Sequence, residues 1–140
     1  MTSTPTPPAQ FGRETGSDGS FQRQESRFRR WVTSGTDGEF PAAAGRYHLY
    51  VSLACPWAHR TVIVRMLKGL EGCIGMTVVD PIRDERGWAF REGAGHSTDP
   101  INGWSFLAEA YTATDPTYSG RVTTPTLWDT QTNQVVSNES

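Results

Sequence analysis

The pattern of apolar and polar positions predicts six regular elements between residues 46 and 136. Short apolar runs bounded by glycine, proline and polar clusters are typical of strands, whereas apolar residues that recur every three or four positions are typical of helices. The clearest helical pattern is an apolar stripe made by Val62, Ile63, Met66, Leu67 and Leu70. The predicted strands cover 46–53, 76–79, 121–128 and 134–136, and the predicted helices cover 56–69 and 104–112.

The predicted order of these elements is β-α-β-α-β-β, which indicates an α/β fold. We expect the first three strands to form a sheet of parallel character, and the polar turn at 129–133 predicts a hairpin for the last two. A thioredoxin-like domain has this order and then one more helix. Because the sequence ends at Ser140, where that helix should begin, we expect 46–140 to form a thioredoxin-like domain that lacks its final helix.

The first 45 residues predict a tail and an extension of that domain. Residues 1–20 consist mostly of Ser, Thr, Pro and Gly, which predicts a disordered tail. Residues 21–45 predict an extension that lays Phe28, Trp31 and Val32 onto the domain and leaves its arginines in water. The alternation of aromatics and arginines over 21–32 is also compatible with a nucleic-acid-binding arm. We disfavour that alternative because the net charge is −2 and no other segment is basic.

The composition indicates the cellular compartment in which the protein is expected. A length of 140 residues allows one domain and a tail. The two cysteines, Cys55 and Cys73, are too few for the disulfide framework of a small secreted protein and suit a reducing compartment. The sequence has neither the apolar run of a signal peptide nor a stretch long enough to cross a membrane. We therefore expect a cytoplasmic protein that has no membrane or nucleic-acid partner.

The strongest candidate for chemistry is Cys55, which follows a predicted strand and precedes Pro56 at the start of a predicted helix. Proline suits the first helical position, and the unpaired N–H groups and the dipole of the helix start favour a thiolate over a thiol. The residue three positions later is Ala58, so the helix supplies no second cysteine to resolve a disulfide. The alternative is a small buried cysteine without reactivity. A reactive Cys55 would need a thiol from outside the protein.

A second candidate lies 70 residues later, where Thr124-Pro125 opens the third strand. A proline at this position suggests a cis peptide bond. In thioredoxin-like folds such a proline faces the cysteine at the helix start, and the residue before it offers its backbone N–H and C=O to a peptide-like ligand. The alternative is an ordinary start of an edge strand. The pairing with Cys55 favours the functional interpretation.

Two other segments are candidates for binding. Glu139 and Ser140 could bind the ammonium and carboxylate of a γ-glutamyl group, although they could equally be a helix cap. Residues 80–103 are polar, glycine-rich and longer than ordinary connections, which predicts a binding loop. His59 lies four residues after Cys55, but His48 and His96 are isolated, so we expect no metal site.

These elements and their flanks resemble the glutathionyl-hydroquinone reductases, the Xi class of glutathione transferases. The resemblance rests first on the run YHLYVSLACPWAHRT at 47–61, whose Cys-Pro-Trp-Ala-His-Arg core is specific within the transferase superfamily. It continues through 87–90, 99–103, 120–123 and 138–140. In all it covers about residues 19 to 140.

The resemblance implies that glutathione is the co-substrate, and it implies a role for each matching residue. Cys55 would be the nucleophile, with Trp88 against glutathione, Arg121 on a glutathione carboxylate, Thr124 beside Pro125 as the backbone partner, and Glu139 and Ser140 at the γ-glutamyl end. Thr124 departs from the aliphatic residue that we expect there, but a backbone contact should survive that change.

The implied activity is the reduction of glutathionyl-hydroquinones through a mixed disulfide between Cys55 and glutathione. The family also has a C-terminal all-helical domain that binds the aromatic substrate, and its full-length members form homodimers. Because the sequence lacks that domain, we expect a truncated protein with impaired activity. Two alternatives remain open, namely a non-catalytic glutathione-binding module and a glutaredoxin-like enzyme that removes glutathione from proteins.

Overall fold

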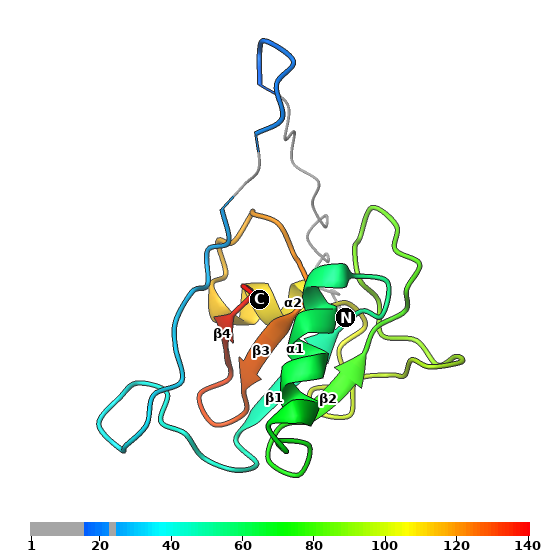
Figure 1. Cartoon of the computed structure of the whole chain (residues 1–140). Coiled ribbons are helices and arrows are strands. Elements are labelled where there is room, and N and C mark those ends of the chain that lie inside the picture. Colours follow the sequence, from blue (N-terminus) through cyan, green and yellow to red (C-terminus); the bar gives the residue numbers. More distant parts are fainter. Residues whose placement is uncertain (1–15, 23–24) are drawn as a thin grey trace, which may run out of the picture.

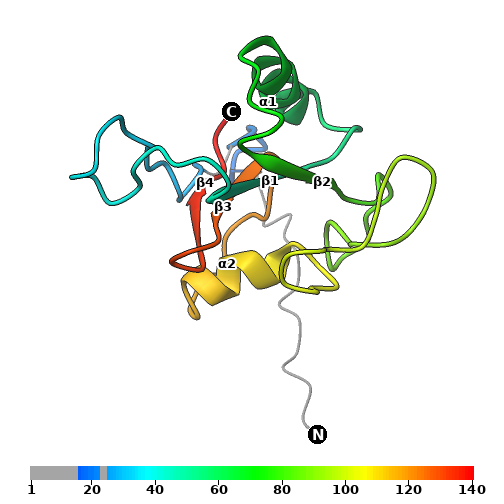
Figure 2. The same ribbon diagram turned by 90° about the horizontal axis from the view of Figure 1, so that it is seen from below.

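In the computed structural model, which describes residues 16–22 and 25–140, two helices lie on opposite faces of one four-stranded sheet (Figure 2). The elements are β1 (Tyr47–Val51), α1 (Pro56–Leu67), β2 (Gly75–Val78), α2 (Ala108–Thr114), β3 (Thr126–Asp129) and β4 (Gln134–Ser137) (Figure 1). This order confirms the predicted β-α-β-α-β-β arrangement and the thioredoxin-like fold. Residues 1–15 of the predicted tail lie outside the described residues.

The strands are arranged β2-β1-β3-β4 in the sheet. β1 and β2 are parallel, as expected, but β3 runs antiparallel to β1, so the prediction of three parallel strands is wrong. The register gives the reason. β2 stops where Val78 pairs with Val51, and β3 starts where Thr126 pairs with Tyr50, which is at the same end of the sheet. The connection between them contains only a seven-residue helix and does not carry the chain back along the strands.

Two predicted elements begin later than the sequence pattern suggested. The helix expected at 104–112 starts at Ala108, because a carboxylate oxygen of Glu109 accepts hydrogen bonds from the amides of Ser105 and Phe106 at 2.7 and 2.9 Å and fixes them ahead of the helix. The strand expected at 121–128 starts at Thr126, directly after a cis peptide bond between Thr124 and Pro125. The suggested cis bond is thus confirmed.

The helix α1 buries less of its apolar stripe than its periodicity suggests. Ala58 is fully buried against the sheet, whereas Met66 and Leu67 are 58% and 80% exposed. No other element in the described part of the chain covers this outer side of α1, so the stripe extends beyond the contact with the sheet. An apolar groove of about 330 Å³ also runs between α1 and the sheet, lined by Leu49, Val64, Leu70, Ile74, Leu127 and others.

The N-terminal extension contacts the domain through fewer aromatics than expected. Phe28 packs against Tyr111 and Tyr118, with ring centres 5.5 and 5.4 Å apart. Trp31 is 81% exposed, so its expected packing is wrong. Arg30 does not lie free in water, since it donates hydrogen bonds to the side chain of Gln134 at 3.1 Å and to the carbonyl of Val135 at 2.5 Å. The extension is therefore attached to β4 by backbone and arginine contacts as well as by apolar side chains.

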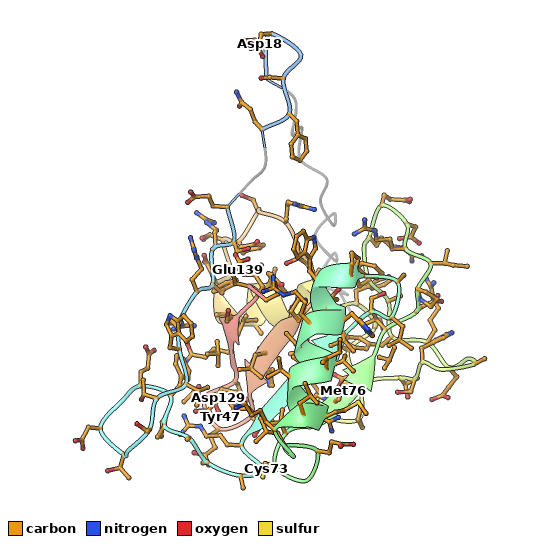
Figure 3. The ribbon with its side chains drawn as sticks, in the orientation of Figure 1. Asp18, Tyr47, Cys73, Met76, Asp129 and Glu139 are labelled. Atoms are coloured by element: carbon orange, nitrogen blue, oxygen red, sulfur yellow. The ribbon has the colours of Figure 1, made fainter. Side chains whose placement is uncertain are left out.

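A buried ion pair closes the end of the sheet at which β1 begins and β3 ends, where Figure 3 labels Tyr47 and Asp129. Arg46 donates two hydrogen bonds, at 2.9 and 2.7 Å, to the two carboxylate oxygens of Asp129, which is fully buried. Burial raises the pKa of Asp129, but hydrogen bonds from Arg46, from the Thr132 hydroxyl and from the Gln131 amide together lower it to about 2. Asp129 is therefore ionised at neutral pH.

A second buried polar contact fastens the loop after β2 to β1. The Tyr50 hydroxyl donates a hydrogen bond of 2.9 Å to the carboxylate of Asp99, which also accepts from the amides of Ile101, Asn102 and Trp104. Burial, with the negative charge of Asp99, raises the pKa of Tyr50, so the hydroxyl stays protonated and keeps donating. This contact holds the 99–104 turn against the sheet.

We predict that Tyr50→Phe lowers the free energy of unfolding by about 2 kcal/mol, because a buried carboxylate loses a hydrogen-bond donor. Urea unfolding at pH 7 measures this loss. Asn102→Ala is the matched control. Its exposed amide is 3.5 Å from the same hydroxyl, so its removal should cost much less. Equal losses in both variants would show that the Tyr50–Asp99 hydrogen bond does not stabilise the fold.

Candidate functional site

Cys55 is the N-cap residue of α1. Its backbone is extended, with φ −103° and ψ 116°, and Pro56 is the first helical residue, as the sequence predicted. The Cys55 carbonyl already accepts a hydrogen bond from the amide of His59 at 3.2 Å. No acidic residue lies in the first turn, so no negative charge there opposes a thiolate. The thiol is half-buried and stands at the positive end of the helix.

A cavity of about 360 Å³ opens beside this thiol. All seven residues that the sequence predicted for catalysis or glutathione binding line it, namely Cys55, Trp88, Arg121, Thr124, Pro125, Glu139 and Ser140. They come from four segments that are far apart in the sequence, and the extension contributes a fifth through Phe21, Glu25 and Ser26. The structure thus brings the predicted residues together around one cavity.

The Thr124–Pro125 segment faces Cys55 across the cavity. The Cys55 thiol donates a hydrogen bond of 3.4 Å to the Thr124 carbonyl, so the backbone just before the cis bond lies directly against the sulfur. Thr124 is 4% exposed, and its hydroxyl has no hydrogen-bond partner among the described residues. The contact between these two segments is made by the Thr124 backbone, so it does not depend on the side chain that departs from the family pattern.

Trp88 reaches the cavity from the predicted binding loop. A turn with Gly87 at φ +88° turns the chain inward, and Trp88 itself is only 6% exposed. The Trp88 carbonyl accepts a hydrogen bond from the Leu107 amide at 2.9 Å, which fixes the backbone beside α2. Its indole N–H has no partner among the described residues. The loop at 80–103 therefore has a firmly buried inner segment at the cavity wall.

Sequence reasoning gave no role to several residues that line this cavity, among them Arg83, Asn138 and Trp57. Arg83 lines it and lies over Trp88, with its guanidinium carbon 4.5 Å from the ring centre. Asn138 accepts a hydrogen bond from the Phe28 amide at 3.3 Å and donates one to the Thr123 hydroxyl at 3.0 Å, which joins the extension to the cavity wall. Trp57, which belongs to the Cys-Pro-Trp-Ala-His-Arg core, is 50% exposed and lines the cavity beside Cys55. Each of these three residues lies in a segment that the sequence had marked, since Trp57 and Asn138 belong to segments that carry the family resemblance and Arg83 lies in the predicted binding loop.

Glu139 and Ser140 follow β4 as an extended segment. The Glu139 amide donates to the Ser137 hydroxyl at 3.1 Å, and Arg60 of α1 donates to the Ser140 hydroxyl at 3.5 Å. Glu139 and Ser140 also border a neighbouring hollow with Glu25, Arg29 and Arg60, which Arg83 and Trp88 do not line. Glu139 therefore lies where the main cavity adjoins this hollow, whereas Arg83 and Arg121 line only the main cavity.

The other candidates of the sequence lie elsewhere. Cys73 lies at the end of α1 opposite to Pro56, on the connection to β2 (Figure 3). His48 is buried and hydrogen-bonded to Thr77 at 2.7 Å, and burial lowers its pKa. Within residues 16–22 and 25–140, no group of three His, Cys, Asp or Glu side chains could hold a metal ion. Neither helix in this part of the chain has the length and apolar character needed to span a membrane.

Comparison with known proteins identifies a matching family model and several similar proteins. Residues 54–140 match the family model described as "Glutathione S-transferase, N-terminal domain". The glutathionyl-hydroquinone reductase YqjG of Escherichia coli is 52% identical over 130 residues, covering 87% of this chain and 39% of the relative. The glutathionyl-hydroquinone reductase PcpF of Sphingobium chlorophenolicum is 48% identical over 124 residues, covering 89% and 38%. The chain thus spans less than half the length of these two relatives.

Solved structures agree in fold. The Xi class glutathione transferase of Natrialba magadii is 50% identical with a TM-score of 0.80, covering 86% of this chain and 38% of that one. The glutathione-bound structure of YqjG is 51% identical with a TM-score of 0.75, covering 80% and 39%. This chain therefore belongs to the glutathione S-transferase family, in its Xi class of glutathionyl-hydroquinone reductases, and its residues 54–140 match the N-terminal domain of that family.

Proposed function

We propose that this chain binds glutathione in the cavity beside Cys55 and uses the Cys55 thiolate to take glutathione from a glutathionyl-hydroquinone. The observation that carries the proposal is the position of the thiol, at the start of α1 and 3.4 Å from the Thr124 carbonyl, in a cavity lined by every residue for which the resemblance implies a role. The names of the relatives support the substrate. Such chemistry uses reduced glutathione, so we also propose a cytoplasmic location.

The proposed reaction has two steps. In the first, the Cys55 thiolate attacks the sulfur of the glutathionyl adduct, a disulfide bond forms, and the bond from sulfur to the aromatic carbon breaks. The aromatic carbon leaves with the electron pair and takes up a proton, which gives the hydroquinone. In the second, a glutathione thiolate attacks the glutathione sulfur of the mixed disulfide, which yields oxidised glutathione and free Cys55. Across the two steps the aromatic carbon is reduced, and the thioether sulfur of the adduct and the thiol of the second glutathione are oxidised to one disulfide.

In this proposal the cavity residues hold the tripeptide so that its sulfur meets Cys55. The Thr124 backbone offers strand-like hydrogen bonds to the cysteinyl part of glutathione, and Arg121 offers a charge-assisted contact to a carboxylate. Glu139 and Ser140 provide an acid and a hydroxyl for the γ-glutamyl ammonium and carboxylate. The family resemblance implies that the aromatic ring binds in an all-helical domain and that full-length members are homodimers, whereas this chain spans 39% and 38% of the length of the two relatives.

We predict that excess oxidised glutathione adds one glutathionyl group to the reduced protein at Cys55, because a thiolate there would attack the disulfide. Intact mass and peptide mapping measure the adduct, and reduced glutathione should remove it. Cys73→Ser is the matched control and should form the same adduct. If no adduct forms, or if it maps to Cys73, Cys55 is not the nucleophile. A protein that binds glutathione without forming an adduct would be a non-catalytic binding module.

A glutaredoxin-like activity shares the first chemical step and differs in the substrate. It would appear as release of glutathione from glutathionylated proteins at a rate that equals or exceeds the rate with glutathionyl-hydroquinones. Comparing the two substrates with the same protein sample separates the two functions, since both pass through the adduct on Cys55.

A further inference from the structure

We propose that Arg83, together with Arg121, binds the glycine carboxylate of glutathione at the Trp88 end of the cavity. Arg83 would then be a specificity residue that selects thiols with a free C-terminal carboxylate. This inference rests on the proposed function, because it assumes that glutathione is the ligand. It adds to that function a residue for which the family resemblance implies no role.

The placement of the two arginines is the first argument. Arg83 and Arg121 come from segments almost forty residues apart, yet both line the cavity that holds Cys55. The pKa of Arg83 is lowered, first by partial desolvation against the cavity wall and then by the positive charge of Arg121, while a negative charge on Cys55 raises it. Two like charges that act on each other across one cavity are stabilised by an anion between them. This end of the cavity therefore favours a negatively charged group.

The contact with Trp88 is the second argument. The Arg83 guanidinium carbon lies 4.5 Å from the centre of the Trp88 ring, and a planar guanidinium can stack on an aromatic face while its edge binds a carboxylate. Trp88 is buried and its backbone is fixed by Leu107, so the ring is a rigid support. A supported guanidinium loses less side-chain entropy when it binds a carboxylate.

The chemistry of glutathione supplies the third argument. Its thiol lies in the middle of the tripeptide, between the γ-glutamyl group and the glycine. If the sulfur meets Cys55 and the γ-glutamyl group lies by Glu139 and Ser140, the glycine points away from the neighbouring hollow, toward the part of the cavity that Arg83, Trp88 and Arg121 line. The only charged group at the glycine end is a carboxylate, which matches the charge of that part of the cavity.

The test pairs a protein change with a ligand change. The full 140-residue chain is titrated calorimetrically with reduced glutathione and with its glycyl monoethyl ester, which lacks the glycine carboxylate. We expect Arg83→Met to weaken binding of glutathione roughly tenfold, as for the loss of a charge-assisted hydrogen bond, and to leave binding of the ester unchanged. Arg83→Lys keeps the charge but not the planar fork, so it should bind glutathione with intermediate affinity.

Arg86→Met is the matched control. Arg86 lies in the same loop and stacks on Phe106 with its guanidinium carbon 4.6 Å from the ring centre, but it does not line the cavity. It should change the affinity for neither ligand. If Arg83→Met weakens the binding of both ligands equally, Arg83 only supports the cavity wall. If it weakens the binding of neither ligand, Arg83 does not contact the ligand. Both results overturn the inference while leaving the proposed function intact. A wild-type protein that binds neither ligand would instead overturn the proposed function, and the inference with it.

Discussion

Replacement of Cys55 by serine is expected to lower the rate of glutathionyl-hydroquinone reduction by on the order of 10³-fold or more. The serine hydroxyl has nearly the same size, but it is not ionised at neutral pH and cannot form a disulfide. The loss should appear in kcat rather than in binding of glutathione, because the contacts offered by Thr124, Arg121 and Glu139 remain. Turnover with a glutathionyl-hydroquinone, together with calorimetric titration of glutathione, measures the two effects separately.

The control for this experiment is Cys73→Ser, since Cys73 lies at the other end of α1 and lines no part of the cavity. It should leave both turnover and binding unchanged. The essential comparison is between the two serine variants of one protein. A Cys55→Ser protein that turns over at the wild-type rate would rule out covalent catalysis by this thiol.

Replacement of Asp129 by asparagine is expected to lower the free energy of unfolding by about 3–5 kcal/mol at pH 7, because it leaves the Arg46 guanidinium without its buried counter-charge. Urea unfolding followed by tryptophan fluorescence measures this loss. A loss of this size is comparable to half of the stability of a typical small domain. We therefore expect the variant to fold only marginally.

The same variant should also change how the free energy of unfolding depends on pH. The folded-state pKa of Asp129, about 2, is below the ordinary value of 3.8, so its ionised form stabilises the wild type fully above about pH 4. That contribution, about 2 kcal/mol, is lost as the pH falls from 4 to 2, and Asp129→Asn should not show this loss. Asp84→Asn is the control, because the pKa of Asp84 is also lowered to about 2 but its ion pair with Arg86 is at the surface. Its effect should be much smaller. Equal effects in the two variants would contradict a stabilising role of burial.

The parts of the fold that are determined by residues close together in the sequence could be predicted from the sequence. Cys55 followed by Pro56 marks the start of α1 because proline fits the first helical position and little else is needed. The order of elements follows from local periodicity in the same way. The direction of β3 could not be predicted, because it depends on where a connection of almost fifty residues re-enters the sheet. The start of α2 depends on the Glu109 carboxylate and its reach to two earlier amides.

The residues of the candidate site also differ in whether the sequence could identify them. The residues that lie together at the cavity could be named from motifs, since a thioredoxin-like order brings Cys55 and Pro125 face to face. Arg83 could not be named, because nothing in the pattern of a polar loop indicates which arginine turns inward and which one, like Arg86, stacks elsewhere. Trp31 illustrates the opposite error, because an aromatic residue in an apolar pattern was expected to pack and is exposed.

The cavity has one more consequence, which concerns the folding equilibrium. Its wall is assembled from five segments spread between Phe21 and Ser140, so it exists only in the folded chain. A ligand that binds there binds the native state and not the unfolded one, and it must stabilise the fold by mass action. At a glutathione concentration one hundred times the Kd, the gain is about 2.7 kcal/mol. Because helix α1 of this domain exposes an apolar side, the concentration of glutathione, the proposed ligand, then becomes one of the quantities that set the population of the folded state.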